Sequence, residues 1–344
     1  MHLPPLEILQ MKLPPGKVPP ETLEVVFRYL GTPREEIIVG PSYGLDGAVV
    51  QIGNKLLVTS MDPITGALER LGWLAVNINA NDVATFGVAP AFFSSCLLLP
   101  EDAIEVTVET ICRQIDSGAK QLNIAVSGGH AEVTPNLGHP IVVGCCMGVA
   151  EEGRYVTAKG AHRGDELILT KTLGIEGTAI LAADRYERFK GRIEESILRE
   201  AERFFDSISV VKEALQAFET GHVTAMHDPT EGGVAGGIHE LAQASGLGFR
   251  VYEERMPVAE ETSRICEFFQ IDPLQLIASG SLLIAAEEGC GHEIVKALRR
   301  SQIIANIIGE LVPSQKTKVI IRKNGNVEDL SKPESDHLWV ALAK

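Results

Sequence analysis

Four aspartates stand where the chain is expected to change direction, and together they could hold a divalent cation. They are Asp46 in Gly44-Leu45-Asp46-Gly47, Asp62 after the strand-like run Leu56–Ser60, Asp82 in Asn81-Asp82, and Asp228 in His227-Asp228-Pro229-Thr230. A carboxylate beside a glycine at the edge of a strand is uncrowded, and Mg²⁺ prefers such hard oxygen ligands while it keeps several waters. Each aspartate taken alone also fits an Asx-turn or a helix cap. Their order along the chain, rather than any one of them, favours a magnesium site.

Two glycine-containing segments could admit the oxygens of a phosphate. Ser127-Gly128-Gly129-His130 and Thr230-Glu231-Gly232-Gly233 each follow an apolar run, and we predict a turn in each. Glycine lets the backbone approach an anion, and a helix N-terminus presents free N–H groups to it. Neither segment matches the Walker or the dinucleotide-binding pattern, so a plain tight turn is the simpler interpretation of each alone. His130 could be a ligand, a base or a packed side chain.

Apolar spacing predicts the elements that would position these residues in the first half of the chain. Residues 1–20 contain six prolines and form an arm. Two strands joined by a hairpin turn at Gly53-Asn54 lie between Asp46 and Asp62 in the sequence. The predicted helices span 20–30, 72–86 and 101–118, and the predicted strands span 48–52, 55–60, 92–99, 124–127 and 140–149.

The second half repeats the alternation of strands and helices, which is typical of an α/β (α+β) fold. A charged, glycine-containing stretch separates the halves, so we predict an N-terminal domain over 1–155 and a C-terminal domain over 156–344. The predicted strands here span 166–170, 248–252 and 281–286, and the predicted helical regions span 194–220, 233–245 and 291–300.

Composition excludes several classes of function. The chain has 344 residues, of which 45% are hydrophobic and 22% are charged, and its net charge is −15. No run of Lys or Arg could follow a nucleic-acid backbone, so nucleic-acid binding is not expected. No run of about 20 apolar residues occurs, so a membrane span is not expected either.

The cysteines and histidines show no metal-binding pattern along the chain. The six cysteines lack CxxC spacing, and most lie in apolar or helical runs, where a reduced, packed thiol is the simplest interpretation. A cytoplasmic protein follows as the expectation. The nine histidines show no HxxxH or HxH cluster, which disfavours a zinc site. No GxSxG elbow supports a serine hydrolase.

Taken in order, these segments resemble the superfamily of aminoimidazole ribonucleotide synthetase-like (PurM-like) ATP enzymes. That superfamily includes hydrogenase maturation factors, selenophosphate synthetase and thiamine-monophosphate kinase. The likeness runs from about Gly16 to Val312, and the second-domain motif is most similar to the hydrogenase maturation (HypE) branch. The landmarks that carry it are Gly44 to Val50, Thr59 to Asp62, Ala75 to Pro90, Ser127 to His130, Met226 to Val234 and Gly280 to Leu282.

The resemblance implies a homodimer, joined through the sheets of the first domains, that binds ATP and Mg²⁺. It implies that Asp46, Asp82 and Asp228 hold the metal on the phosphates. It also implies nucleotide contacts at Asp62 and the Gly128-Gly129 segment, and we add Asn77, Asn81 and Gly232 to the expected cofactor-binding residues. Lys17 of the arm and His130 are the candidate catalytic residues.

Several departures from the family pattern bear on function. Leu45 stands where many relatives have a second aspartate, and His130 stands where the hydrogenase maturation enzymes commonly have aspartate. Those enzymes end in Pro-Arg-Ile-Cys, whereas this sequence ends in Ala343-Lys344; selenophosphate synthetase carries a reactive residue in its arm, where this chain has no cysteine before Cys96. We therefore expect an ATP-using enzyme that activates an oxygen of a small-molecule or protein-bound acceptor by phosphoryl transfer. The alternatives are a thiamine-monophosphate kinase-like enzyme and a nucleotide-binding partner that has lost catalysis and works in a maturation complex.

Overall fold

The computed structural model describes residue 13 and residues 16–66 and 68–344. Two compact units are distinguished, which divide after Pro33. The first contains helix α1 (Pro20–Val26), which is shorter than the helix predicted over 20–30. Most of the predicted arm lies outside the described residues. Among the described residues, all the strands and the remaining helices belong to the second unit, Arg34–Lys344.

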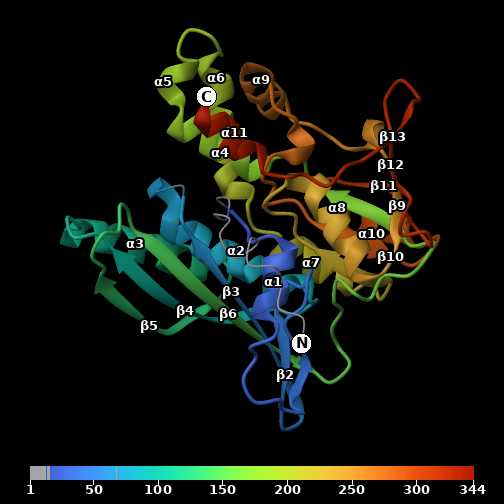
Figure 1. Ribbon diagram of the computed structural model, residues 1–344, viewed down its shortest axis with the longest axis horizontal. Coiled ribbons are helices and arrows are strands. Elements are labelled where there is room, and N and C mark those ends of the chain that lie inside the picture. Colours follow the sequence, from blue (N-terminus) through green and yellow to red (C-terminus); the bar gives the residue numbers. More distant parts are fainter. Residues whose placement is uncertain (1–12, 14–15, 67) are drawn as a thin grey trace, which may run out of the picture. The chain divides into compact units, whose positions relative to one another are not determined.

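The first half of this unit forms a six-stranded sheet in the order β1-β2-β3-β6-β4-β5. Only β4 and β5 pair in parallel. Helices α2 and α3 pack on this sheet and on each other (Figure 1). The strands are β1 (Ile37–Val39), β2 (Ala48–Ile52), β3 (Lys55–Ile64), β4 (Pro90–Leu99), β5 (Ala125–Val133) and β6 (Ile141–Glu151), and the helices are η2 (Leu68–Arg70), α2 (Leu71–Thr85) and α3 (Glu105–Gln121).

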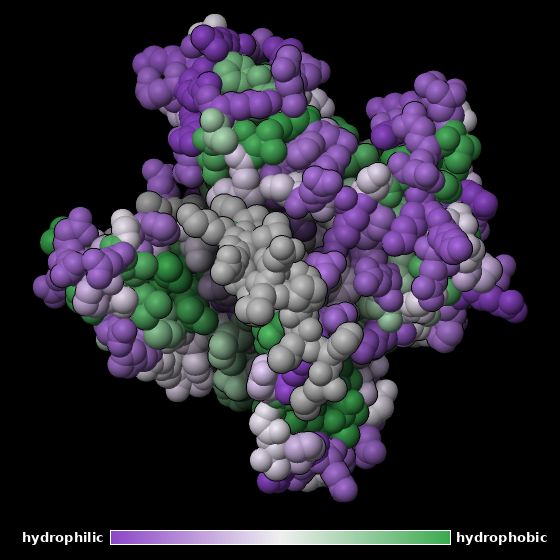
Figure 2. All heavy atoms as spheres, viewed as in Figure 1, coloured by the Kyte–Doolittle hydropathy of each residue, from purple (hydrophilic) through white to green (hydrophobic). Residues whose placement is uncertain are grey.

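The face of this sheet that packs on the helices supplies a core, and the opposite face is also apolar. Burial alternates along β3 and β6, as it does in a sheet with one covered face. Several outward positions nevertheless hold large hydrophobic side chains instead of the polar ones usual on a solvated face. Among them, Met61, Phe92 and Val149 are exposed. Figure 2 shows hydrophobic side chains at the surface in the region where Figure 1 places α3, β4 and β5.

The second half forms a seven-stranded sheet in the order β13-β12-β9-β11-β7-β10-β8. All its pairs are antiparallel except β12 with β9. Strand β8 lies at one edge, and its carboxyl end leads into helix α8. The strands are β7 (Glu166–Thr170), β8 (Val223–His227), β9 (Gly248–Tyr252), β10 (Leu283–Ala286), β11 (Ala305–Val312), β12 (Lys318–Ile321) and β13 (Val327–Asp329).

None of the helices among the described residues is both long and apolar enough to cross a membrane. The helices of the second half are α4 (Ile175–Asp184), α5 (Tyr186–Phe189), α6 (Glu195–Glu202), η3 (Arg203–Ser207), α7 (Val211–Phe218), α8 (Gly233–Ala244), η4 (Glu253–Arg255), α9 (Glu260–Phe269), η5 (Pro273–Gln275), α10 (Gly291–Arg300) and α11 (His337–Ala343). They include α7, α8 and α10, which contact the second sheet, and α4, α6 and α9, which pack on one another.

Most predicted elements are confirmed, and two differ in ways that matter for the site. The helical region predicted over 194–220 is broken between η3 and α7, because residues 208–210 leave the helix and bond to a side chain of α2. Strand β3 continues to Ile64, so Asp62 lies within the strand and not after it.

Candidate functional site

Asp46 lies in the loop before β2, and two glycines let this loop pack closely against its neighbours. Gly44 has a φ of +75°, and a Cβ there would lie 3.0 Å from the carbonyl oxygen of Glu240 in α8. A Cβ at Gly47 would lie 2.6 Å from the carbonyl oxygen of Thr59 in β3. Larger residues at these positions would push the loop away from both elements, so the glycines determine where Asp46 stands.

Asp62 and Asp82 come from β3 and α2, which hydrogen bonds hold together at this point. The N–H of Asp62 donates to Oδ1 of Asn79 at 2.8 Å, and Nδ2 of Asn79 donates to the Asp62 carbonyl at 3.3 Å. The Ser60 hydroxyl donates to Oδ2 of Asp82 at 2.6 Å. The side chains of Asn79 and Ser60 thus fix the register between the strand and the helix beside the two aspartates.

His227 ends β8, and Asp228 follows it directly. Nδ1 of His227 lies 2.8 Å from Oδ2 of Asp46, and Nε2 lies 3.0 Å from Oε2 of Glu240. One possible ligand atom from each of Asp46, His227 and Asp228 lies within 4.8 Å of the others. Residues about 180 positions apart in the sequence are therefore brought to one place by the packing of the first-sheet loop against β8 and α8.

The aspartates repel one another in a buried setting. Burial is the largest cause that raises the pKa of Asp82 well above its usual value, and the charges of Asp228, Asp62 and Asp46 raise it further. The hydrogen bond from Ser60 opposes these effects. All four aspartates predicted from the sequence are thus close enough to interact.

The buried imidazole of His227 is held in its charged form. Burial lowers the pKa of His227, but the charges and hydrogen bonds of Asp46 and Glu240 together outweigh it and raise the pKa to about 10. Both ring nitrogens of the imidazolium then donate hydrogen bonds, which leaves no lone pair for a metal. His227 is therefore an internal counter-cation, and the donors that remain for a metal at this site are carboxylate oxygens.

A magnesium ion fits this donor set. Hard carboxylate oxygens are the ligands that Mg²⁺ takes in proteins. A bound cation would also relieve the repulsion that raises the pKa of Asp82, because a metal is the largest local charge in such a site.

Asn77 and Asn81 are buried on α2 and are bonded to the backbone. Nδ2 of Asn77 donates to the Trp73 carbonyl at 2.9 Å. Nδ2 of Asn81 donates to the carbonyl of Ile208 at 2.9 Å, and its Oδ1 accepts from the N–H of Val210 at 2.8 Å. Asn81 therefore ties α2 to the segment before α7, while the predicted contact of either asparagine with a nucleotide stays a prediction.

The turn predicted at residues 127–130 is wrong, because Gly128 and Gly129 lie inside β5. The register between β4 and β5 shifts at this point, so Ser127 is an extra residue that forms a bulge. Gly128 has a φ of +153°, and a Cβ at Gly129 would lie 2.2 Å from the carbonyl oxygen of Ser95. Gly129 allows close pairing with β4, a need that glycine spacing alone does not distinguish from a turn.

His130 also lies on β5, which is the edge strand of the first sheet. Its side chain is 65% exposed, and its Nε2 lies 3.1 Å from Oε2 of Glu132. It is not among the groups that shift the pKa of Asp82. His130 and the Gly128-Gly129 pair thus lie on a strand that β4 and β6 separate from β3, the strand of Asp62.

Gly232 caps α8, and its N–H already binds a carboxylate of the chain. Gly232 has a φ of +84°, and its N–H donates to Oδ2 of Asp336 at 2.6 Å. Oδ1 of Asp336 accepts from the N–H groups of Leu338 at 2.6 Å and Ile277 at 3.2 Å. Burial raises the pKa of Asp336 to about 6 against these hydrogen bonds. The helix N-terminus that the sequence offered to a phosphate holds Asp336 instead.

Lys17 belongs to the first compact unit, so its predicted role stays a prediction. Four further residues bond to the aspartates or to His227 and were not predicted from the sequence as part of the site: Ser60, Asn79, His227 and Glu240. Two signals could have found some of them. The asparagines at 77, 79 and 81 alternate in one helix, and His227 directly precedes Asp228.

Two family models match consecutive parts of the chain. The one described as AIR synthase related protein, N-terminal domain, matches residues 44–150, and the one described as AIR synthase related protein, C-terminal domain, matches residues 162–322. Together they cover every aspartate of the cluster and the strands of both sheets other than β1, β13 and the last residue of β6. The chain belongs to the AIR synthase related protein family. The family resemblance drawn from the sequence landmarks is thereby confirmed.

Relatives in this family include proteins of hydrogenase maturation. The chain is 27% identical over 330 residues to a putative hydrogenase expression/formation protein of Methanocaldococcus jannaschii, covering 92% of this chain and 94% of the relative. It is also 27% identical over 257 residues to carbamoyl dehydratase HypE of Escherichia coli, covering 73% of each chain.

Solved structures share the fold. A chain of a HypE–HypF complex superposes with a TM-score of 0.76 at 22% identity, covering 92% of this chain and all of that chain. HypE in complex with ATP gives 0.70 at 21% identity, covering 91% of each chain. A ThiL protein complexed with AMPPCP and TMP gives 0.71 at 19% identity, covering 91% of this chain and 94% of that one. The PurM-like two-sheet fold predicted from the sequence is confirmed.

Proposed function

We propose that this protein is a magnesium-dependent, ATP-using enzyme that activates an oxygen of an acceptor by phosphoryl transfer. The observation that carries the proposal is the convergence of Asp46, Asp62, Asp82 and Asp228 from separate segments onto one buried site. Burying like charges together costs free energy. Such groupings are typical of sites in which a ligand neutralises the charge. The ATP complex of HypE and the AMPPCP complex of ThiL, which share this fold, support a nucleotide as that ligand.

Asp46, Asp82 and Asp228 would hold Mg²⁺, and Asp62 would lie beside the nucleotide. Bound there, the metal would neutralise charge on the phosphates and orient them for attack. His227 holds Asp46 in place through their hydrogen bond. Asn79 and Ser60 keep Asp62 and Asp82 in place through the contacts described above.

The direct test is the hydrolysis of ATP by the purified protein with and without Mg²⁺ in the presence of candidate acceptors. The proposal expects turnover that needs Mg²⁺ and that is lost in Asp82→Asn. Lys17→Ala and His130→Ala then test the candidate catalytic residues. Turnover that is indifferent to both Mg²⁺ and Asp82 would refute the assignment.

The acceptor is best sought among two classes. The hydrogenase-maturation relatives favour a carbamoylated group on a protein, whereas the likeness to a ThiL complex containing TMP favours thiamine monophosphate. Leu45, which replaces a family carboxylate, favours the remaining alternative, a partner protein that binds nucleotide without turnover. Formation of ADP with thiamine monophosphate, with a carbamoylated peptide, or with neither separates the three.

We also propose that the protein is a homodimer formed through the open face of the first sheet. The exposed side chains of Met61, Phe92 and Val149 make this face apolar, and a second copy would cover it. The double variant Met61→Lys/Val149→Lys should be monomeric by light scattering. The matched control is Val327→Lys, which changes an exposed valine of β13 in the other sheet. A dimer that persists in the double variant would contradict the assignment of this face.

A further inference from the structure

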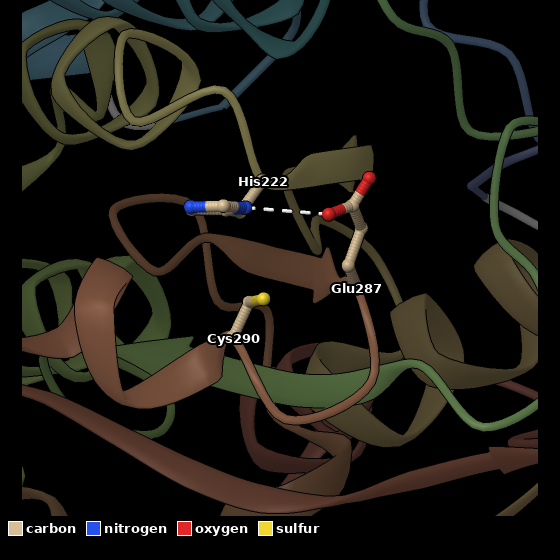
Figure 3. Close-up of side chains that lie close together, drawn as sticks. All are labelled: His222, Glu287 and Cys290. Carbon is tan, nitrogen blue, oxygen red and sulfur yellow. Dashed lines mark hydrogen bonds and ion pairs between the residues drawn. The ribbon is translucent and has the colours of Figure 1, made fainter.

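A second group of possible metal ligands lies at the opposite end of β8 from the aspartates. His222 precedes this strand, Glu287 follows β10, and Cys290 precedes α10. One ligand atom from each lies within 4.8 Å of the others. Figure 3 shows the imidazole, carboxylate and thiol directed toward a common space, with Nδ1 of His222 3.2 Å from Oε2 of Glu287. The group offers one nitrogen, one oxygen and one sulfur donor.

Backbone hydrogen bonds hold the three residues in place without any ligand. The N–H of Glu287 donates to the His222 carbonyl at 3.0 Å, which continues the pairing of β10 with β8. The N–H of Cys290 donates to the Glu287 carbonyl at 2.9 Å, closing a turn in which Gly289 has a φ of +81°. The N–H of Gly291 donates to Oε2 of Glu166 at 2.8 Å. The donors therefore project from a fixed frame, which is what a metal site requires.

The spacing of the two turn residues is typical of metal-binding turns. Glu287 and Cys290 stand three residues apart across the turn, as do the paired ligands of CxxC zinc sites. The third donor, His222, stands directly before the neighbouring strand β8, 65 residues before Glu287 in the sequence. This separation explains why the sequence showed no zinc pattern.

A carboxylate also holds the second nitrogen of the imidazole. Oε2 of Glu293 lies 3.3 Å from Nε2 of His222. A metal-bound histidine commonly donates its other ring N–H to a carboxylate, which fixes the ring and its tautomer. Glu293 would therefore leave Nδ1 of His222 as the nitrogen directed at the metal.

We propose that His222, Glu287 and Cys290 form a site for Zn²⁺. Zinc accepts nitrogen, sulfur and carboxylate oxygen in tetrahedral geometry, and three protein ligands leave the fourth position to water or another ligand. A thiolate and an imidazole are poor ligands for Mg²⁺, so this site and the aspartate cluster take different metals. The zinc ion joins the start of β8 to the turn before α10, and Glu293 is a positioning residue.

Cobalt is the probe, because a cobalt–thiolate bond has a charge-transfer absorption that a carboxylate site lacks. Titration of the metal-free full-length protein with Co²⁺ should produce this absorption and saturate at equimolar metal. Cys290→Ser should abolish it, and His222→Gln and Glu287→Gln should weaken Zn²⁺ binding, measured by competition with a chromophoric chelator, by at least about 100-fold. Glu293→Gln should keep the absorption and weaken Zn²⁺ binding about 10-fold to 100-fold.

Cys112→Ser is the matched control, since it changes an exposed thiol on α3, and it should leave both measurements as in the wild type. Glu288→Gln, which changes the neighbouring carboxylate in the same turn, should do the same. The proposal is overturned if the absorption is absent in the wild type or persists in Cys290→Ser. It is also overturned if the three ligand variants bind Zn²⁺ as tightly as the wild type does.

Discussion

The two clusters at the ends of β8 differ in burial, in donor atoms and in the way their charges are balanced. At the carboxyl end, Asp82, His227 and Asp228 are buried, and the carboxylates act on one another. At the amino end, the His222–Glu287–Cys290 cluster is partly open to solvent. The ends are five residues apart, roughly 16 Å along the strand.

The difference in burial explains why the clusters at the two ends of β8 should bind different metals. In a buried site, repulsion between carboxylates is weakly screened, so it destabilises the metal-free protein and is relieved when a cation binds. At an exposed site, solvent screens the charges, and selectivity rests on the type of donor atom. The buried cluster should therefore affect folding and function in opposite directions, whereas the exposed cluster should matter only when metal is bound.

The largest expected effect comes from Asp82→Asn. This change should lower Mg²⁺-dependent ATP turnover by about 100-fold or more, because loss of a direct ligand costs at least as much as loss of an outer-shell group. The same change removes a repelled, buried charge, so it should raise the free energy of unfolding of the metal-free protein. Turnover assays and urea unfolding measure the two effects.

Asp165→Asn is its control. Asp165 is a buried aspartate that accepts from the N–H of His162 at 2.8 Å and from Thr224. Asp165→Asn should lower the free energy of unfolding and leave ATP turnover unchanged, which is the opposite of the result expected for Asp82→Asn. If Asp82→Asn were both less stable and fully active, the idea of repulsion that a cation relieves would fail.

The next effect comes from His227→Gln, which removes the internal counter-cation. Removing one partner of a buried charged group leaves the others uncompensated, so the variant should lose about 3 kcal/mol of unfolding free energy near neutral pH. Because the folded pKa is raised to about 10 from 6.5, this stabilisation is complete below pH 6.5 and is lost as the pH rises through about 10. Urea unfolding across this pH range provides the measurement.

His239→Gln is the control for that pH dependence. His239 is also buried, but burial lowers its pKa to about 4, so it is neutral above that pH. Its loss should cost a nearly constant amount between pH 6.5 and 10. Parallel pH profiles for the two variants would show that His227 does not carry the charge assigned to it.

An effect of similar size is expected at Glu176, a buried carboxyl of α4 with no cation assigned to it. Burial raises its pKa from 4.5 to about 7, with further contributions from Asp336 and Glu231. Its contribution to stability is therefore complete below pH 4.5 and is lost as the pH rises through about 7, a fall of roughly 3 kcal/mol. Glu176→Gln should lack this fall in pH-dependent thermal unfolding, and an unchanged profile would contradict the shift.

The smallest effect is expected from Cys290→Ser in metal-free protein. A partly exposed side chain without a buried partner contributes little, so the unfolding free energy should change by less than about 0.5 kcal/mol. With Zn²⁺ present, the wild type should gain stability that the variant does not gain. A large loss without metal would place Cys290 in the core instead of at a site.

Elements with strong periodicity were predictable, and the contacts between them were not. The strand at 166–170 and the helix at 291–300 have the predicted bounds, because their apolar spacing and flanking glycines mark them clearly. Glycine was ambiguous at 128–129, where it permits close strand pairing and not a turn.

The aspartates of the site were found by their order, whereas their partners depend on the fold. Asp82 and Asp228 could be singled out because each lies in a distinctive motif. The pairing of His227 with both Asp46 and Glu240 requires that a loop and a helix meet at the end of β8. No local sequence pattern predicts that contact, and none predicts the contact of His222 with Glu287.

Ligand-induced stabilisation most directly tests whether the aspartates form a magnesium–nucleotide site. Thermal unfolding of the wild type and of Asp82→Asn would be followed with a non-hydrolysable ATP analogue, with and without Mg²⁺. At 100 times its Kd the analogue should stabilise the wild type by about 2.7 kcal/mol, only when Mg²⁺ is present, and should leave Asp82→Asn unchanged. Equal stabilisation of both proteins, or stabilisation of the wild type that does not need Mg²⁺, would contradict the account.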